Sequence, residues 1–174
     1  MSAIRWTVYD SPIGPLTLVA SDAGLAALGF PGRSPVPSEA TKAPMPEVTK
    51  QLDGYFAGEL RQFEIPLDLR GTPLELAVWR RLLEIPYGET ATYGEQAARI
   101  EASLFDSDVE AWQRARVVGA ANGRNPVAIV VPCHRVIGAD GSLTGYGGGL
   151  DRKRLLLDLE RRVAGVDDPQ LSLL

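Results

Sequence analysis

Apolar residues cluster in three short runs at the start of the chain, over residues 6–9, 16–20 and 25–30. Turn-forming residues separate these runs, with Pro and Gly in the first gap and Gly in the second. The pattern predicts three strands joined as an antiparallel meander.

A proline-rich segment over residues 31–46 predicts a loop. From Pro46 onward apolar positions recur every three or four residues, which predicts a helix that stops near Gly58. The buried face of this helix comprises Val48, Leu52, Tyr55 and Phe56. Residues 63–69 alternate again, and a proline at position 66 favours an edge strand there.

Helix signals dominate the second half of the chain. Capping boxes, in which Thr or Ser is followed three residues later by Glu, begin at Thr72, Thr92 and Ser107. They predict helices that end near residues 85, 100 and 122. The last two helices form a candidate helix-turn-helix, since the second of them carries arginines.

A continuous apolar run over residues 127–131 predicts a buried strand that leads into Cys133. A glycine-rich loop follows at residues 144–149, and we expect a final helix over residues 152–162, with Asp151 as a possible N-cap. Its inward residues would be Leu155, Leu156 and Leu159. The tail after Gly165 is expected to be held loosely.

These elements predict an α+β fold in two parts. Residues 1–70 would form a small antiparallel sheet with a helix. Residues 71–174 would form a mostly helical unit with a winged-helix-like helix-turn-helix.

Composition narrows the functional classes. The chain is 45% hydrophobic and 23% charged, as in soluble globular proteins, and has no run long enough to span a membrane. A net charge of -4 argues against a protein that coats DNA, but it allows a local basic face. A single cysteine favours the reducing cytoplasm. One Cys and one His cannot form a Cys–His zinc site, so we predict neither a metal nor a cofactor.

Cys133 is the candidate nucleophile. Free cysteines are usually buried and inert, but His134 and Arg135 are basic neighbours that can lower a thiol pKa. Consecutive side chains on a strand point apart, so a relay from Cys133 through water to His134 is favoured over a direct pair. Glu160 is one of several acids that could orient His134.

The segment from Pro132 to Arg135 resembles the O6-alkylguanine-DNA alkyltransferases, also called methylated-DNA–protein-cysteine methyltransferases. The similarity is strong over residues 72–162 and looser in the N-terminal half, where Ser11–Gly14 carry it. The similar segments are residues 85–90, before the first DNA-binding helix; 116–126, the recognition helix and hinge; 130–138, the active-site strand and turn; and 144–149, the substrate loop.

The resemblance implies direct-reversal DNA repair. An alkyl group would move irreversibly from O6-alkylguanine in double-stranded DNA to the protein, after the damaged nucleotide is flipped out of the helix. Each molecule would act once, because a thioether has no obvious hydrolytic exit. The sequence does not decide whether alkylated thymine is accepted, and it indicates no obligate protein partner.

The resemblance also implies catalytic roles. Cys133 would accept the alkyl group, His134 would act as base through water, and Glu160 would orient His134. Tyr93 would donate a proton or hydrogen bond to the leaving guanine, and Asn125 would brace the active-site turn. Structural alternatives stay open, and for Glu160 the alternative is a surface pair with Arg154 or Arg161.

Binding roles follow in the same way. The implied substrate-binding residues are Val136, Tyr146, Gly147 and Gly148. The implied DNA-binding residues are Arg116, Ala120, Ala121, Asn122, Arg124 and Arg135. Arg116 would fill the gap that the flipped nucleotide leaves.

The connection between Tyr93 and Arg116 is longer than is usual in this family. The extra residues include four acids, Glu101, Asp106, Asp108 and Glu110. Acids oppose DNA binding unless they point away from the phosphates. Our hypothesis is that this segment protrudes beside the duplex and tunes access to it.

Three other functions remain as alternatives. A lesion-binding relative without transfer is disfavoured because such relatives replace the acceptor cysteine. A Cys–His hydrolase is disfavoured because its two catalytic residues are not usually adjacent in sequence. A transcription factor would bind a specific sequence in undamaged DNA.

Overall fold

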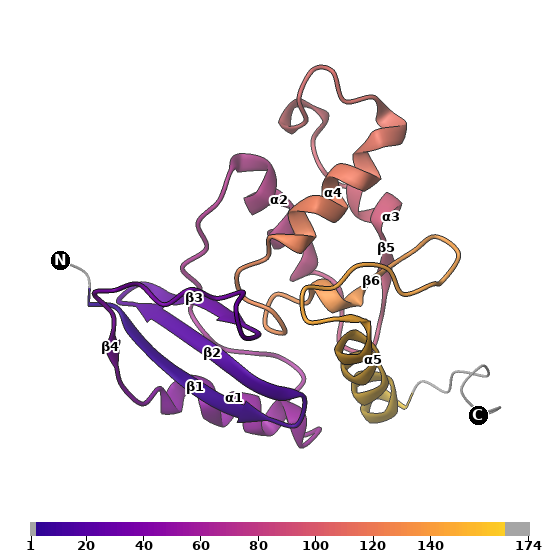
Figure 1. Cartoon of the computed structure of the whole chain (residues 1–174). Coiled ribbons are helices and arrows are strands. Elements are labelled where there is room, and N and C mark those ends of the chain that lie inside the picture. Colours follow the sequence, from indigo (N-terminus) through magenta and orange to yellow (C-terminus); the bar gives the residue numbers. More distant parts are fainter. Residues whose placement is uncertain (1–2, 166–174) are drawn as a thin grey trace.

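A four-stranded sheet forms the N-terminal part of the computed structural model, which describes residues 3–165 (Figure 1). β1 (Arg5–Ser11), β2 (Gly14–Ser21) and β3 (Gly24–Gly29) pair in antiparallel order and confirm the predicted meander. β4 (Thr41–Lys42) pairs in parallel with β1, inside the segment predicted to be a loop.

Helix α1 (Pro46–Phe56) lies along one side of this sheet (Figure 1). The Tyr9 ring stacks on Phe56 and its hydroxyl donates to Asp53 at 2.6 Å. Three of the predicted inward residues, Val48, Leu52 and Tyr55, are buried, and Phe56 packs against the core from a partly buried position.

The strand predicted over residues 63–69 is wrong. The structure has only an isolated bridge between Leu25 and Leu67, flanked by hydrogen bonds from the Leu25 amide to the Pro66 carbonyl and from the Asp68 amide to the Leu25 carbonyl. Pro66 has no amide hydrogen to donate, so the ladder cannot extend through it.

The second half is mostly helical, as predicted. Its helices are α2 (Pro73–Leu82), α3 (Tyr93–Ala98), α4 (Arg114–Gly123) and α5 (Leu150–Ala164). Thr72 and Thr92 cap α2 and α3 through complete capping boxes, as the sequence predicts. No helix in residues 3–165 is both long and apolar enough to cross a membrane.

The third predicted capping box is wrong. Ser107 begins no helix, and two single turns, η1 (Ala102–Leu104) and η2 (Ala111–Gln113), precede α4. Glu110 is instead the N-cap of η2, three residues after Ser107, and its amide donates to the Gln113 side chain at 2.8 Å. α3 and α4 pack together but are joined by residues 99–113, which rise above them (Figure 1).

Residues 127–131 are buried as expected, but they do not form a strand. Ile129 has a φ of 72° and turns the chain back, so only Val127 forms a bridge, to Leu28 of β3. A residue with left-handed backbone cannot continue an extended strand.

Helix α5 also differs from expectation. It begins after Gly149, so Asp151 is not its N-cap. Leu155 is 54% exposed, whereas the buried face includes Leu156, Lys153 and Glu160. The tail after Gly165, expected to be loosely held, lies outside the described residues.

Candidate active site around Cys133

Asn125 shapes the turn that presents Cys133. Its side-chain amide donates to the Val131 carbonyl at 2.7 Å, and its side-chain oxygen accepts from the Val127 amide at 3.0 Å. One side chain thus joins both ends of the turned segment that replaces the predicted strand. Cys133 follows directly, in the single turn η3 (Cys133–Arg135), with its side chain half-buried.

Opposing effects act on the Cys133 thiol. Burial raises its pKa, while the hydrogen bond from Asn125 and the positive charges of Lys153 and Arg33 act to lower it. Burial is the largest effect, so the pKa is raised overall. A base that removes the thiol proton during attack is therefore useful at neutral pH.

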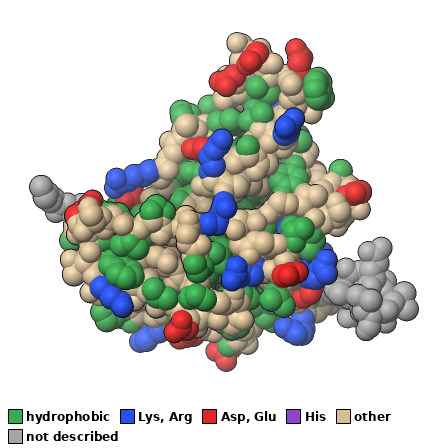
Figure 2. Space-filling model, in the orientation of Figure 1, with side chains coloured by type: hydrophobic (Ala, Val, Ile, Leu, Met, Phe, Trp, Pro, Cys, Tyr) green, Lys and Arg blue, Asp and Glu red, His purple; other side chains and the backbone are tan. Residues whose placement is uncertain are grey.

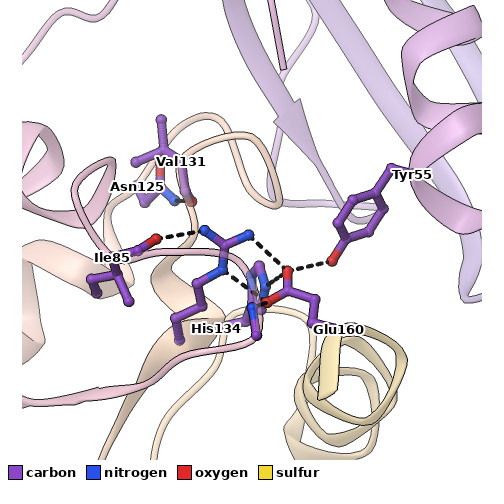
Figure 3. A network of polar contacts seen from close by, with 8 residues as sticks. Tyr55, Ile85, Asn125, Val131, His134 and Glu160 are labelled. Atoms are coloured by element: carbon purple, nitrogen blue, oxygen red, sulfur yellow. Dashed lines mark hydrogen bonds and ion pairs between the residues drawn. The ribbon is translucent and has the colours of Figure 1, made fainter. Parts of the chain in front are cut away.

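His134 meets Glu160 in the interior (Figure 3). Its Nε2 lies 2.7 Å from Oε1 of Glu160, and both side chains are fully buried. Burial lowers the pKa of His134, which favours the neutral ring. With Nε2 facing a carboxylate, the proton of that ring is assigned to Nε2, which leaves Nδ1 free to accept a proton.

Glu160 accepts four further hydrogen bonds. Two come from Arg135, at 2.8 Å from Nε and 3.0 Å from Nη2, one comes from the Tyr55 hydroxyl at 2.8 Å, and a longer one comes from the Gly88 amide at 3.5 Å. Although burial alone would raise the pKa of Glu160, the interactions with His134 and Arg135 hold it far below its usual range. The alternative of a surface pair with Arg154 or Arg161 is therefore wrong.

Arg135 does not lie where a DNA-binding residue is expected. Its guanidinium is buried, engaged by Glu160, and it donates to the Ile85 carbonyl at 2.7 Å. It also lies over the Tyr87 ring, 5.6 Å from the ring centre. Arg135 thus neutralises Glu160 rather than meeting phosphates. Neither this role nor that of Tyr55, which reaches the site from α1, was predicted from the sequence.

Two adjoining cavities of about 390 and 260 Å³ open beside Cys133. The residues that line both are Arg33, Asn122, Gly123, Cys133, Tyr146 and Gly147. Arg33 was not predicted, and its isolated position in a loop gives no sequence signal. It donates from Nη2 to the Gly123 carbonyl at 3.1 Å, across the mouth of the cavities.

The glycine loop packs tightly against the N-terminal half. A Cβ atom on Gly148 would lie 2.4 Å from the Phe30 ring, and one on Gly147 would lie 2.7 Å from Nε of Arg33. The Tyr146 ring packs edge-on against Phe30, and its buried hydroxyl has no hydrogen-bond partner within residues 3–165. Glycine at these two positions allows the loop to close over the cavities.

Lys153, on α5, holds this loop through hydrogen bonds to its backbone. This role was not predicted from the sequence. Lys153 is fully buried, and its Nζ donates to the carbonyls of Val136, Thr144 and Gly145 at 2.5, 3.0 and 3.3 Å. Burial lowers its pKa to about 8. Its spacing of three and seven residues from Leu156 and Glu160 places all three on one helix face, and this spacing could have revealed it.

Val136 lines neither cavity beside Cys133. Its side chain is fully buried in β6 (Val136–Ile137), which pairs in parallel with β5 (Ala91–Thr92). This pairing brings Tyr93, the next residue after β5, to the second cavity. The Tyr93 hydroxyl donates to the Thr144 carbonyl at 2.9 Å, and burial raises its pKa.

The expected DNA-binding residues of α4 divide into two groups. Arg116, Ala120 and Arg124 are exposed, whereas Ala121 and Asn122 are buried and do not lie on the outer surface. The Ala121 carbonyl accepts from the Trp79 indole at 3.0 Å. Both amide atoms of Asn122 are buried without a hydrogen-bond partner in the described part of the chain, beside the cavities that it lines.

Comparisons with known proteins agree over both halves of the chain. Residues 4–69 match the family model described as 6-O-methylguanine DNA methyltransferase, ribonuclease-like domain, and residues 73–162 match its DNA binding domain. A methylated-DNA–protein-cysteine methyltransferase of Mycobacterium bovis is 50% identical over 168 residues, which cover 94% of this chain and 96% of the relative. Another, from Methanosarcina acetivorans, is 45% identical and covers 89% and 97%.

A solved structure is also similar. Mycobacterium tuberculosis OGT in complex with DNA has a TM-score of 0.79 and 48% identity, and the match covers 92% of this chain and 94% of that one.

Proposed function

This chain belongs to the 6-O-methylguanine DNA methyltransferase family, and from that premise we propose that Cys133 accepts an alkyl group from O6-alkylguanine in double-stranded DNA. Its enzymatic class is that of a methylated-DNA–protein-cysteine methyltransferase, and its role is DNA repair by alkyl transfer. The observation that carries the residue assignment is the half-buried Cys133 thiol, which lines two cavities and precedes the buried His134–Glu160 pair.

The proposed reaction is a displacement at the alkyl carbon. The Cys133 proton passes through water to Nδ1 of His134, which has no partner within residues 3–165. Sγ then bonds to the alkyl carbon as the bond from that carbon to O6 breaks. Guanine leaves with the electron pair and takes up one proton, so the thiol hydrogen has in effect been exchanged for the alkyl group.

Tyr93 is placed to assist the departure of guanine. Because its pKa is raised, the phenol keeps its proton at neutral pH and can donate a hydrogen bond to the purine. Its present acceptor, the Thr144 carbonyl, belongs to the loop that would cover the base. Tyr146, Gly147 and Gly148 would form the remaining wall of the base pocket.

The proposal includes flipping of the damaged nucleotide. An alkylated O6 inside a duplex is out of reach of Sγ, and extruding the nucleotide costs a few kcal/mol. Arg116 is exposed on α4 and borders a shallow hollow that it shares with Tyr93 and Gly119. It could fill the vacated stack and so offset part of that cost.

We also propose that the chain divides near residue 70, into an N-terminal α+β domain and a C-terminal domain for DNA binding and transfer. The two family models meet between residues 69 and 73, which supports this division. Tyr55 and Arg33 come from the first part and complete the site in the second. The requirement for a reduced thiol supports a cytoplasmic location.

The deciding experiment is intact mass spectrometry after mixing the protein with excess duplex DNA containing O6-methylguanine. We expect a gain of one methyl group per molecule on Cys133 and then no further turnover. Cys133→Ser is the control and should gain nothing. Tight binding of the lesion without a mass change would instead indicate a lesion-binding protein without transfer. Repetition with O4-methylthymine tests the wider substrate range.

A further inference from the structure

Trp112 is the most exposed large hydrophobic side chain in residues 3–165, with 80% of its surface open. A tryptophan side chain can bury about 150–250 Å² when it is covered, which makes it a strong contributor to interfaces. Single exposed apolar residues are common and need no explanation by themselves. Trp112 differs from such residues because its turn is held by hydrogen bonds and because it lies next to α4 and a group of acidic residues.

The segment that carries Trp112 is anchored at both ends. Phe105 is buried in the core, and the guanidinium of Arg114 lies over its ring, 5.1 Å from the ring centre. The Gln113 side chain accepts from the Glu110 amide, and the Gln113 amide donates to the Glu110 carbonyl. Trp112 therefore projects from a fixed helical turn rather than from a loose loop.

That turn continues directly into α4, so the side chains of both can share a face. Exposed positions recur every four residues, at Trp112, Arg116 and Ala120. Arg116 and Ala120, four residues apart in α4, lie above one another with a rise of about 6 Å, and Trp112 lies in the 3-10 turn η2 that directly precedes α4. Gly119 and Gly123, on the same side of α4, line the cavity that contains Cys133. Trp112 thus extends the row of residues that borders the entrance to the site.

The charges near Trp112 indicate which part of a bound DNA its side chain can contact. The exposed acids Glu101, Asp106, Asp108 and Glu110 precede Trp112, and acidic side chains gather at that end of the molecule (Figure 2). They disfavour close approach of phosphates. An uncharged indole between this acidic end and Arg116 suits a base or a deoxyribose instead.

We propose that Trp112 packs its indole against bases and sugars of the bound DNA, next to the place occupied by Arg116. This inference rests on the proposed function, since it needs α4 to face the duplex. Apolar side chains at minor-groove interfaces often wedge against base steps, and base–aromatic stacking tolerates any sequence. The long connection would then strengthen binding through Trp112 while its acids stay clear of the backbone.

Affinity measurements provide the first test. The dissociation constant for a duplex with one O6-methylguanine is measured for Trp112→Ala and Trp112→Phe in a Cys133→Ser background, which prevents transfer. We expect Trp112→Ala to weaken binding about tenfold and Trp112→Phe to weaken it less. The salt dependence of binding should not change, because the uncharged indole of Trp112 neutralises no phosphate. Val8→Ala, another exposed apolar residue, is the matched control.

Fluorescence provides the second test. Trp112→Phe keeps a ring but removes one fluorescent tryptophan. Subtracting its emission from that of the parent therefore gives the emission of Trp112 without that of Trp6 and Trp79. We expect DNA to quench this difference signal. Equal affinity for Trp112→Ala and the Val8→Ala control, with no quenching, would overturn the proposal. Self-association that depends on Trp112, with unchanged DNA affinity, would also overturn it and identify a second copy as the partner. Failure of the methyl transfer itself, with quenching intact, would refute the proposed function alone.

Discussion

Nε2 of His134 and Oε1 of Glu160 lie 2.7 Å apart, with neither side chain open to solvent. The same carboxylate is neutralised by Arg135 and accepts from Tyr55, a residue of the N-terminal helix. Removing water from such a group is costly, and only a complete set of donors compensates for it. Glu160 therefore orients His134 and also ties the two halves of the chain together.

Replacing Glu160 with Gln should destabilise the protein strongly. Arg135 would remain buried without its counter-charge, and breaking a buried pair in this way costs about 3–5 kcal/mol. Urea denaturation measures the loss. Glu84→Gln is the control, because Glu84 pairs with Arg81 and Arg99 at the surface, where such pairs contribute at most about 1 kcal/mol. Similar losses of unfolding free energy in both variants would show that the buried Glu160 pair stabilises the protein no more than a surface pair does.

The same carboxylate should make stability sensitive to acid. The pKa of Glu160 is lowered in the folded protein from its ordinary value of 4.5, so the unfolded chain binds its proton first as pH falls. Its stabilising contribution is therefore complete above about pH 4.5 and is lost as pH falls below that value toward the low folded pKa. Denaturation between pH 7 and pH 3 should show this loss in the parent. The advantage of the parent over Glu160→Gln should shrink over the same range, and a constant difference would contradict the assignment.

Lys153 should assist ionisation of Cys133. Its positive charge acts to lower the pKa of the Cys133 thiol, so Lys153→Met should raise that pKa further and slow alkylation of Cys133 by iodoacetamide at pH 7. Because the pKa of Lys153 is itself lowered to about 8, the difference between parent and variant should fade above that pH. Lys50→Met, at an exposed lysine, is the control. An unchanged pH profile in Lys153→Met would show that Lys153 only holds the loop.

Sequence predicted the elements whose signals are local. The meander and the helices capped by Thr72 and Thr92 depend on residues within a few positions of one another. Residues 127–131 look like a strand because they are apolar, but the Asn125 side chain closes them into a turn. Burial by itself does not distinguish the two conformations.

The site shows the same division. The family resemblance pointed to Cys133 and His134, whereas Arg135 and Arg33 acquire their positions from partners far away in the chain. Arg135 meets Glu160 on the last helix, and Arg33 meets Gly123 across the mouth of the cavities. No local pattern records such contacts, so a basic residue beside the nucleophile was expected to meet DNA and instead lies in the core.

Arg33 should limit the size of the alkyl group that reaches Cys133. Its guanidinium spans from the Gly123 carbonyl to Gly147, at the mouth of the cavities. Arg33→Ala opens this passage, so the transfer rate from O6-benzylguanine, relative to that from O6-methylguanine, should rise about tenfold. In Arg33→Lys, which retains a charge but has a smaller head group, this rate ratio should lie between those of the parent and Arg33→Ala. Single-turnover rates with both DNA substrates give the ratio, and an unchanged ratio in Arg33→Ala would show that Gly147 and Tyr146 alone set the opening.

The Asn122 side chain should lower the stability of the free protein and, in the complex, bind the edge of the flipped base. Its amide is buried with no hydrogen-bond partner in the described residues, and a buried polar group left unpaired costs about 1–3 kcal/mol. Since it lines both cavities beside Cys133, its donor and acceptor are available to the edge of a flipped base. Asn122→Leu should therefore raise the free energy of unfolding by about 1 kcal/mol and slow methyl transfer at least tenfold.

Gln96→Leu is the matched control for Asn122→Leu. The Gln96 side chain is also buried, its Oε1 has no hydrogen-bond partner within residues 3–165, and it lines neither cavity beside Cys133. Gln96→Leu should alter stability without slowing transfer. If Asn122→Leu is more stable and transfers methyl groups at the parental rate, the Asn122 amide does not read the base. If it is less stable, the amide is satisfied in the free protein, and the unpaired polar group cannot explain its presence.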